Sequence, residues 1–147
     1  MKHNNEHTNA FLIHISAFAG YLFPFGSIII PLIFWQTLKE RSPFLDNQGK
    51  EAVNFNISYS LYIFIASIIA VPFFVGSFLN RVRNNWGYSY HYDFDIDFGI
   101  ENFFGLIGFT SLVGIIGLIK VALIILAAIK ANKGENYKYP LTINFIK

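Results

Sequence analysis

The sequence predicts an all-α membrane protein, a bundle of three transmembrane helices whose first helix is broken at Pro24, with a short β-like extracytoplasmic segment. Hydrophobic residues make up 54% of the chain and charged residues 14%, about half the charged share of a soluble domain. The apolar residues gather in three blocks, each long enough for the roughly 20 residues that a membrane crossing needs. Backbone inside lipid must satisfy its own hydrogen bonds, so these blocks should be helices. We expect a single integral membrane domain over residues 1–147.

The first predicted span, about residues 10–35, contains several residues that interrupt helices. Gly20, Pro24, Gly26 and Pro31 all lie inside it. Proline lacks the backbone N–H and disfavours helix in the residue before it. Two structures fit this pattern: one kinked spanning helix, or a re-entrant hairpin of two short half-helices that turns at residues 24–26. The kinked span is preferred, because membrane helices tolerate proline and glycine.

The second predicted span, about residues 53–79, follows a helix-start signal. Asp46 is a good N-cap candidate, so the helix should begin near Asn47. Asn54 and Ser58 then fall one helical turn apart, and Tyr62 falls another turn further on. These polar groups should therefore lie along one side of the helix.

The third predicted span, about residues 103–131, carries small residues at which another helix can approach closely. These are Gly105, Gly108, Gly114 and Gly117. Packing within the monomer is the preferred interpretation of this surface. Self-association with a second copy is the alternative.

Lys120 and His14 are ionisable residues inside the apolar blocks. Lys120 could lie near the middle of the membrane, where a charge is a functional hypothesis by default. Its available partners are His14, Ser16, Ser27 and the carbonyl groups freed at the Pro24 break. Alternatively, the long third block protrudes and Lys120 snorkels to the interface. His14 is interpreted as a satisfied polar group rather than a proton relay.

The distribution of basic residues predicts the orientation of the chain in the bacterial inner membrane. The loop 36–52 and the tail 132–147 are rich in lysine and arginine, whereas the loop 80–102 has only Arg81 and Arg83. By the positive-inside rule, loop 36–52 and the C-terminal tail are cytoplasmic and loop 80–102 is extracytoplasmic. The side of the N-terminus depends on whether the first block crosses or turns back.

The external loop contains YSYHYDFDIDF, which alternates with the period of a β-strand. His91, Asp93, Asp95 and Asp97 would point to one face of such a strand. A single cation site is disfavoured, because neighbouring acids on that face lie about 6–7 Å apart and calcium binds oxygens at about 2.3–2.6 Å. Two interpretations remain: a strand that packs on the membrane surface, or a strand that docks on a partner. The candidate partner-docking residues are Tyr90, His91, Tyr92, Asp93, Phe94, Asp95 and Asp97.

Several function classes are disfavoured by what the sequence lacks. The chain has no cysteine, which excludes disulfides and thiol chemistry. Its net charge of +2 is too small to favour nucleic acid as a partner. No metalloprotease, nucleophile-elbow or phosphate-loop motif occurs. We therefore predict no enzymatic activity, no cofactor and no metal.

Three segments together resemble a known family: HISAFAGYLFPFGSIIIPLIFW, SPFLDNQGKEAVNFNISYSLY and AAIKANKGENYKYPLTINFIK. They are similar to small bacterial multi-pass membrane proteins of a family of unknown function. That family is considered distantly related to the twenty-kilodalton subunit of the chloroplast inner-envelope protein translocon. The resemblance covers nearly the whole chain except residues 80–101. It implies a bundle of three or four spans and supplies no catalytic residues.

Most positions that carry the resemblance fall on the predicted cytoplasmic side. The candidate cytoplasmic motif comprises Asp46, Lys50, Glu51, Asn54, Glu135 and Pro140. The segment 49–54 could lie against the segment 134–140 as a polar lid, with Lys50 and Glu135 as an ion pair. An exposed pair contributes only about 0–1 kcal/mol, so it would orient the lid more than stabilise it.

The sequence therefore predicts a non-enzymatic accessory or scaffold subunit of an inner-membrane complex, with protein transport or insertion as its setting. Its predicted partners are the lipid bilayer and either another membrane protein or a second copy of itself. The alternative is a small channel or transporter with a pathway near Pro24 and Lys120, because broken helices occur where irregular backbone lines a cavity.

Overall fold

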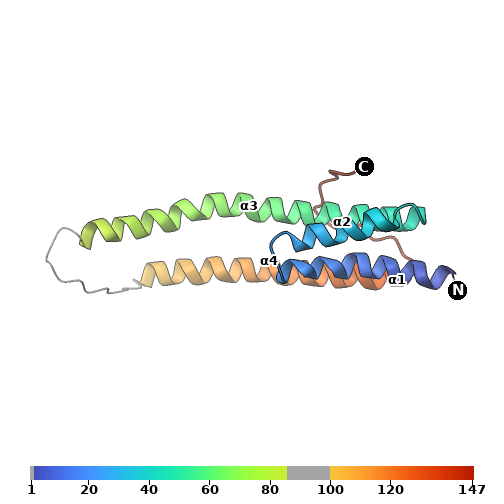
Figure 1. Cartoon of the computed structure of the whole chain (residues 1–147). Helices are drawn as coiled ribbons and strands as arrows, with labels where there is room; N and C mark the ends of the chain where they lie inside the picture. Colours follow the sequence, from blue (N-terminus) through green and yellow to red (C-terminus); the bar gives the residue numbers. More distant parts are fainter. Residues whose placement is uncertain (1, 86–99) are drawn as a thin grey trace. The chain divides into compact units, whose positions relative to one another are not determined.

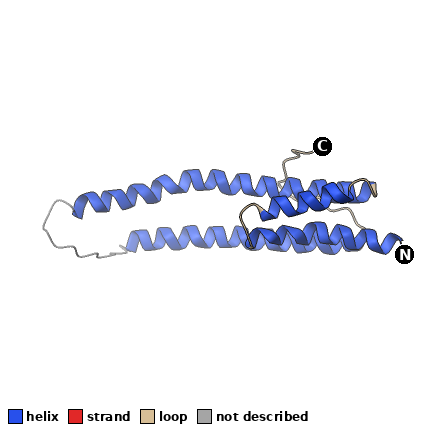
Figure 2. Cartoon of the chain, viewed as in Figure 1, coloured by secondary structure: helices blue, strands red, loops and turns tan. Residues whose placement is uncertain are grey.

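The structure is a computed structural model that describes residues 2–85 and 100–147. All regular structure in these two ranges is helical, so the all-α class is confirmed for them (Figure 1, Figure 2). The elements are α1 (Lys2–Ile15), the 3-10 helix η1 (Ser16–Tyr21), α2 (Gly26–Leu38), α3 (Pro43–Asn85) and α4 (Ile100–Asn132). The predicted β-like segment lies outside the described residues.

The chain divides into two compact units. The first comprises residues 1–61 and 116–147, and the second comprises residues 62–115. In the second unit, the described apolar side chains of α3 and α4 are mostly exposed, among them Phe64, Ile68, Leu112 and Ile115. The first unit holds the buried core.

The first apolar block forms a hairpin of α1 and η1 against α2. The chain leaves η1 at Tyr21, turns, and re-enters helix at Gly26, with Phe25 in the left-handed region at a φ of 63°. Close packing of the arms requires glycine, since a Cβ on Gly20 would lie 2.7 Å from the Ser27 Cβ. The break predicted at Pro24 is therefore present, and the two arms fold back on each other instead of continuing as one kinked helix.

Helix α3 begins four residues earlier than the sequence indicates. Ser42, not Asp46, is the N-cap: its Oγ accepts a hydrogen bond from the Leu45 N–H at 3.2 Å. Pro43 occupies the first helical position, where its missing N–H costs nothing. Asp46 instead accepts a hydrogen bond from the Trp35 indole at 2.9 Å, which ties α2 to the first turns of α3.

Two groups of buried side chains form the core of the first unit. The hairpin, the start of α3 and the end of α4 meet in one of them, made of Ala10, Ile13, Leu38, Leu45, Ala52 and Ala131. The other adds the C-terminal tail and is made of Ala17, Phe55, Ile124, Ala127 and Tyr139. Alanines at the end of α4 let the neighbouring segments approach closely, as small residues do in membrane helices.

One helical stretch in the described residues, Thr110–Asn132, is long and apolar enough to cross a membrane by length and composition. It coincides with most of the third predicted span. Only 17% of its most apolar window is buried, whereas the core helix of a soluble protein would be mostly covered. Membrane association is thus supported, and the total of three spans stays a prediction.

Three glycines of α4 have no neighbour in the described part of the chain. A Cβ added to Gly108, Gly114 or Gly117 would meet nothing within 4 Å. Packing within the monomer is therefore wrong for these three positions, and self-association remains a prediction.

Gly49 provides a direct test of how α2 packs on α3. A Cβ at Gly49 would overlap the Trp35 indole and lie 2.7 Å from the Trp35 Cβ, whereas one at Gly114 has open space. We expect Gly49→Ala to destabilise the fold by about 1–3 kcal/mol, as overpacking usually does. The matched control Gly114→Ala should be neutral. Thermal unfolding in detergent measures both, and equal melting temperatures would contradict the α2–α3 packing.

Candidate functional site

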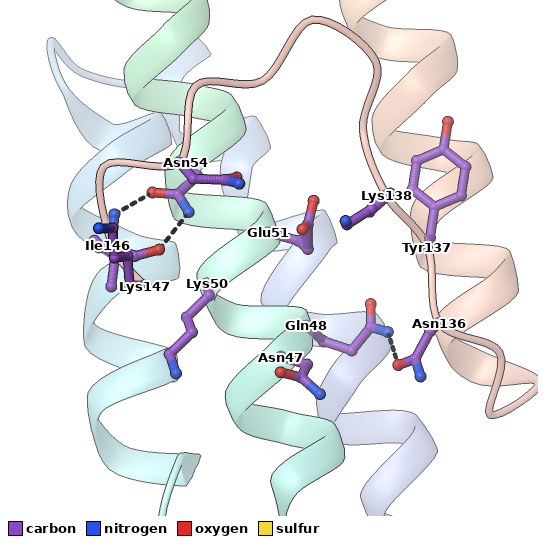
Figure 3. Close-up of a pocket in the computed structure, with 11 residues that line it drawn as sticks. Asn47, Gln48, Lys50, Glu51, Asn54, Asn136, Tyr137, Lys138, Ile146 and Lys147 are labelled. Atoms are coloured by element: carbon purple, nitrogen blue, oxygen red, sulfur yellow. Dashed lines mark hydrogen bonds between the residues drawn. The ribbon is translucent and has the colours of Figure 1, made fainter.

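A stripe of polar side chains on α3 faces the C-terminal tail (Figure 3). Gln48, Glu51, Asn54 and Ser58 recur every three or four residues, so they lie on one face of the helix. The tail, residues 133–147, runs past this face without regular secondary structure. Its backbone polar groups therefore need partners from elsewhere.

Asn54 and Ser58 supply such partners at the far end of the tail. The Asn54 Oδ1 accepts a hydrogen bond from the Ile146 N–H, and its Nδ2 donates to the Ile146 carbonyl, both at 2.9 Å. The Ser58 Oγ accepts from the Ile143 N–H at 2.9 Å and donates to the Asn54 carbonyl at 2.7 Å. One amide side chain thus pairs with both backbone groups of a single residue, much as a neighbouring strand would.

A buried chain of hydrogen bonds joins the near end of the tail to the hairpin. The Gln48 Nε2 donates to the Asn136 Oδ1 at 3.2 Å and to the Glu135 carbonyl at 3.4 Å. Because a carbonyl can only accept, this orients the Gln48 Oε1 toward the His14 Nε2, 2.7 Å away. The His14 Nε2 must then donate, and its Nδ1 accepts from the Tyr139 hydroxyl at 2.9 Å. This tautomer is assigned from the network.

His14 is therefore a satisfied polar group, as predicted, but its partners lie on other segments of the chain. It is fully buried, and its hydrogen bonds go to a neutral amide and a phenol. Tyr139 is 5% exposed and stacks on Phe55 with ring centroids 4.0 Å apart. Burial raises the pKa of the Tyr139 hydroxyl well above 10, with the nearby Tyr137 and Glu51 adding to the shift. Tyr139 thus remains a neutral hydrogen-bond donor.

Between α3 and the tail lies an open groove of about 500 Å³, which we call the tail groove (Figure 3). Lysines border it on both sides, with Lys50 on α3 and Lys138 on the tail. Glu51 lies between them and accepts a hydrogen bond from the Tyr139 N–H at 3.3 Å. The lining residues are Asn47, Gln48, Lys50, Glu51, Asn54, Asn136, Tyr137, Lys138, Asn144, Ile146 and Lys147.

The predicted ion pair between Lys50 and Glu135 does not form. Lys50 instead pairs with Asp46 one turn earlier on α3, at 2.6 Å, and Glu135 lies 3.9 Å from Lys130. The hydrogen bond from Lys50 lowers the pKa of Asp46, partial burial opposes this, and the Trp35 hydrogen bond adds to the lowering. Each acid pairs with a base close by in sequence, because short sequence separation leaves the least chain to order.

The structure brings together most of the predicted cytoplasmic motif. Lys50, Glu51 and Asn54 line the tail groove, and Glu135 contributes its backbone carbonyl to Gln48. Pro140 lies exposed in a turn of the tail. Sequence reasoning did not single out Gln48 or Tyr139. The signal that could have found Gln48 is its place one turn before Glu51 on the helix that carries Asn54 and Ser58.

Lys120 is buried among other side chains of the first unit, 8% exposed, and its depth in a membrane stays a prediction. Its Nζ lies 4.3 Å from the centroid of the Tyr59 ring on α3. A cation over an aromatic face is attracted by the negative electrostatic potential above the ring, which its quadrupole creates. The partner is therefore an aromatic ring that the sequence analysis did not name.

The candidate docking residues Tyr90, His91, Tyr92, Asp93, Phe94, Asp95 and Asp97 lie outside the described residues. Within the described ranges, no cluster of three or more histidine, aspartate or glutamate side chains could hold a metal ion.

The hydroxyl of Tyr139 can be removed without removing its ring. Tyr139→Phe should leave the stack on Phe55 intact and deprive the buried His14 Nδ1 of its donor. An unsatisfied buried group costs about 1–3 kcal/mol, so we expect a lower melting temperature. The matched control is Tyr137→Phe, whose ring is half-buried at the groove edge. If both variants melt like the wild type, the buried chain of hydrogen bonds does not hold the tail.

The two hydrogen bonds between the Asn54 side chain and the Ile146 backbone, which we call the clasp, can be tested by exchanging one group of Asn54. Asn54→Asp replaces the Nδ2 donor by an oxygen that faces the Ile146 carbonyl, so the end of the tail should detach. Trypsin should then cleave after Lys138 faster than in the wild type, as followed by mass spectrometry of the released fragment. Asn47→Asp is the control, since Asn47 is exposed two turns earlier on the same helix. Unchanged cleavage of Asn54→Asp would contradict the clasp.

Comparison with known proteins gives one match. No curated protein and no solved structure matches the chain significantly. The sequence profile of one family matches residues 5–146, which include every element of the tail groove. This agrees with the predicted resemblance to a small bacterial family, and the relation to a translocon subunit stays a prediction. The chain belongs to the MamF/MmsF family, described as the magnetosome magnetite crystal formation protein family.

Proposed function

We propose that the protein is a non-enzymatic accessory subunit of a bacterial inner-membrane complex, and that the tail groove is the surface to which a partner subunit binds. The observation that carries this proposal is the preformed shape of the groove. Side chains of α3 already hold the backbone of the tail at residues 135, 139, 143 and 146. A partner that binds there does not have to order the tail, which reduces the entropy cost of association.

The charges of the groove favour an acidic or amide-rich partner segment. Lys50, Lys138 and Lys147 line the groove together with Glu51, so basic groups outnumber acidic ones. Asn47, Asn136 and Asn144 add side-chain amides that can donate and accept hydrogen bonds. Charge complementarity of this kind speeds association and selects among partners.

Family membership supports an accessory role for a membrane-associated protein. The link to protein transport or insertion rests on the sequence resemblance alone. The channel alternative has less support, since neither Pro24 nor Lys120 lines the tail groove. Pro24 lies exposed in the hairpin turn and Lys120 lies against Tyr59.

Charge reversal at one lysine tests this function. Lys138→Glu should abolish the complex that is recovered by crosslinking in mild detergent and resolved by native mass spectrometry. Lys133→Glu is the control, because Lys133 is exposed on the same tail but does not line the groove. Recovery of only monomer from wild-type membranes would count against an accessory subunit. A complex that survives Lys138→Glu would count against the groove.

A further inference from the structure

We propose that the hairpin of α1, η1 and α2 is a re-entrant element: its apolar turn inserts among lipid acyl chains near mid-membrane, and the N-terminus stays on the same side as the C-terminal tail. This assigns a lipid-contact surface to the turn and a side to the N-terminus. It does not depend on the function of the tail groove.

Contacts along α4 show how deep the hairpin reaches. His7 lies beside Gly134, where a Cβ would be 2.7 Å from the His7 ring. Further along, Ala17 packs in one cluster with Ile124 and Ala127. As the residue number rises along the first arm it falls from the tail into α4, so the first arm and α4 run antiparallel (Figure 1).

The turn of the hairpin reaches the depth of Lys120. Ala17 packs in one cluster with Ile124, and from that contact Tyr21 lies four residues further along η1 while Lys120 lies four residues back along α4. The Lys120 Nζ lies over the Tyr59 ring. Twelve residues separate Lys120 from the end of the apolar stretch at Asn132, which is about 18 Å of helix. A hydrocarbon core is about 30 Å thick. The turn therefore lies near the middle of the membrane when α4 crosses it.

The apolar part of each arm is too short to cross. In the first arm it comprises residues 10–21, about 21 Å at the rises of an α-helix and a 3-10 helix. Helix α2 has 13 residues, which is about 20 Å at 1.5 Å per residue. It is apolar but shorter than a span. Both arms are polar at the open end of the hairpin, at residues 2–9 in the first half of α1 and at residues 39–41 after α2.

The exposed side chains of the turn fit acyl chains. Leu22 is 85% exposed, Phe25 71% and Tyr21 66%, and Ile29 and Ile33 continue the apolar surface along α2. Apart from the Tyr21 hydroxyl, residues 21–26 carry no polar or charged side chain. In water such a contiguous apolar surface would be unfavourable, whereas α4 also exposes apolar side chains beside Lys120, at Leu118 and Ile119. Lipid is therefore the occupant to which this surface is assigned.

The absence of native cysteine allows a clean labelling experiment on the purified full-length chain in proteoliposomes. Single variants Asn5→Cys, Glu40→Cys and Lys133→Cys carry the label at the open end of the hairpin and on the tail. All three should react with a membrane-impermeant maleimide from the same side. Labelling of Asn5→Cys from the side opposite to Lys133→Cys would overturn the proposal, because the first block would then cross.

The depth of the hairpin turn in the membrane is measured with a nitroxide label attached to the new cysteine of Leu22→Cys or Phe25→Cys. Both labels should be protected from a water-soluble nickel relaxation agent and accessible to oxygen, while the label on Glu40→Cys should show the reverse. The liposomes contain only this chain and phospholipid, so protection reports insertion into lipid or contact with a second copy. Repeating the measurement at high lipid dilution separates these two. Protection lost on dilution, or nickel access at either turn position, would overturn lipid insertion.

Discussion

The amide of Gln48 is the contact that joins the separate segments of the first unit. It donates to the tail at Glu135 and Asn136 and accepts from His14 on the hairpin. A primary amide suits this position, because it can donate and accept at once in fixed directions. Buried polar groups are costly when unsatisfied, so the position of each segment constrains the others through this one side chain.

The same constraint explains how the tail stays ordered without secondary structure. A helix satisfies its own backbone, whereas an extended segment does not. Side chains of α3 take the role of a neighbouring strand, most completely where Asn54 pairs with both backbone groups of Ile146. The groove beside the tail is a consequence of this arrangement, and its lysines come from both of its walls.

The hairpin extends from the polar end of the first unit, near the tail, to the apolar part of α4 around Lys120. His14 ties the middle of the first arm to Gln48 and Tyr139, and Ala17 beyond it packs with Ile124, one turn of α4 from Lys120. Because the open end of the hairpin is bound to the tail, the two ends of the chain belong to one polar surface. An accessory protein built this way would offer a partner its tail groove while the apolar helices hold it in the bilayer.

Composition and local chemistry were enough to predict helices, membrane association, the break at Pro24 and the shared face of Asn54 and Ser58. Each of these follows from a property of a residue or of its spacing, such as the missing N–H of proline. Local pattern could not choose between a kink and a hairpin, because that choice depends on the fit of Gly20 against Ser27. The i,i+4 pair of Asp46 and Lys50 was within reach of the local pattern, whereas the contact of Lys120 with Tyr59 on another helix was not. His14 and Tyr139 are 125 residues apart in the chain, and only the packing of the hairpin, α3 and the tail together brings them within hydrogen-bonding distance.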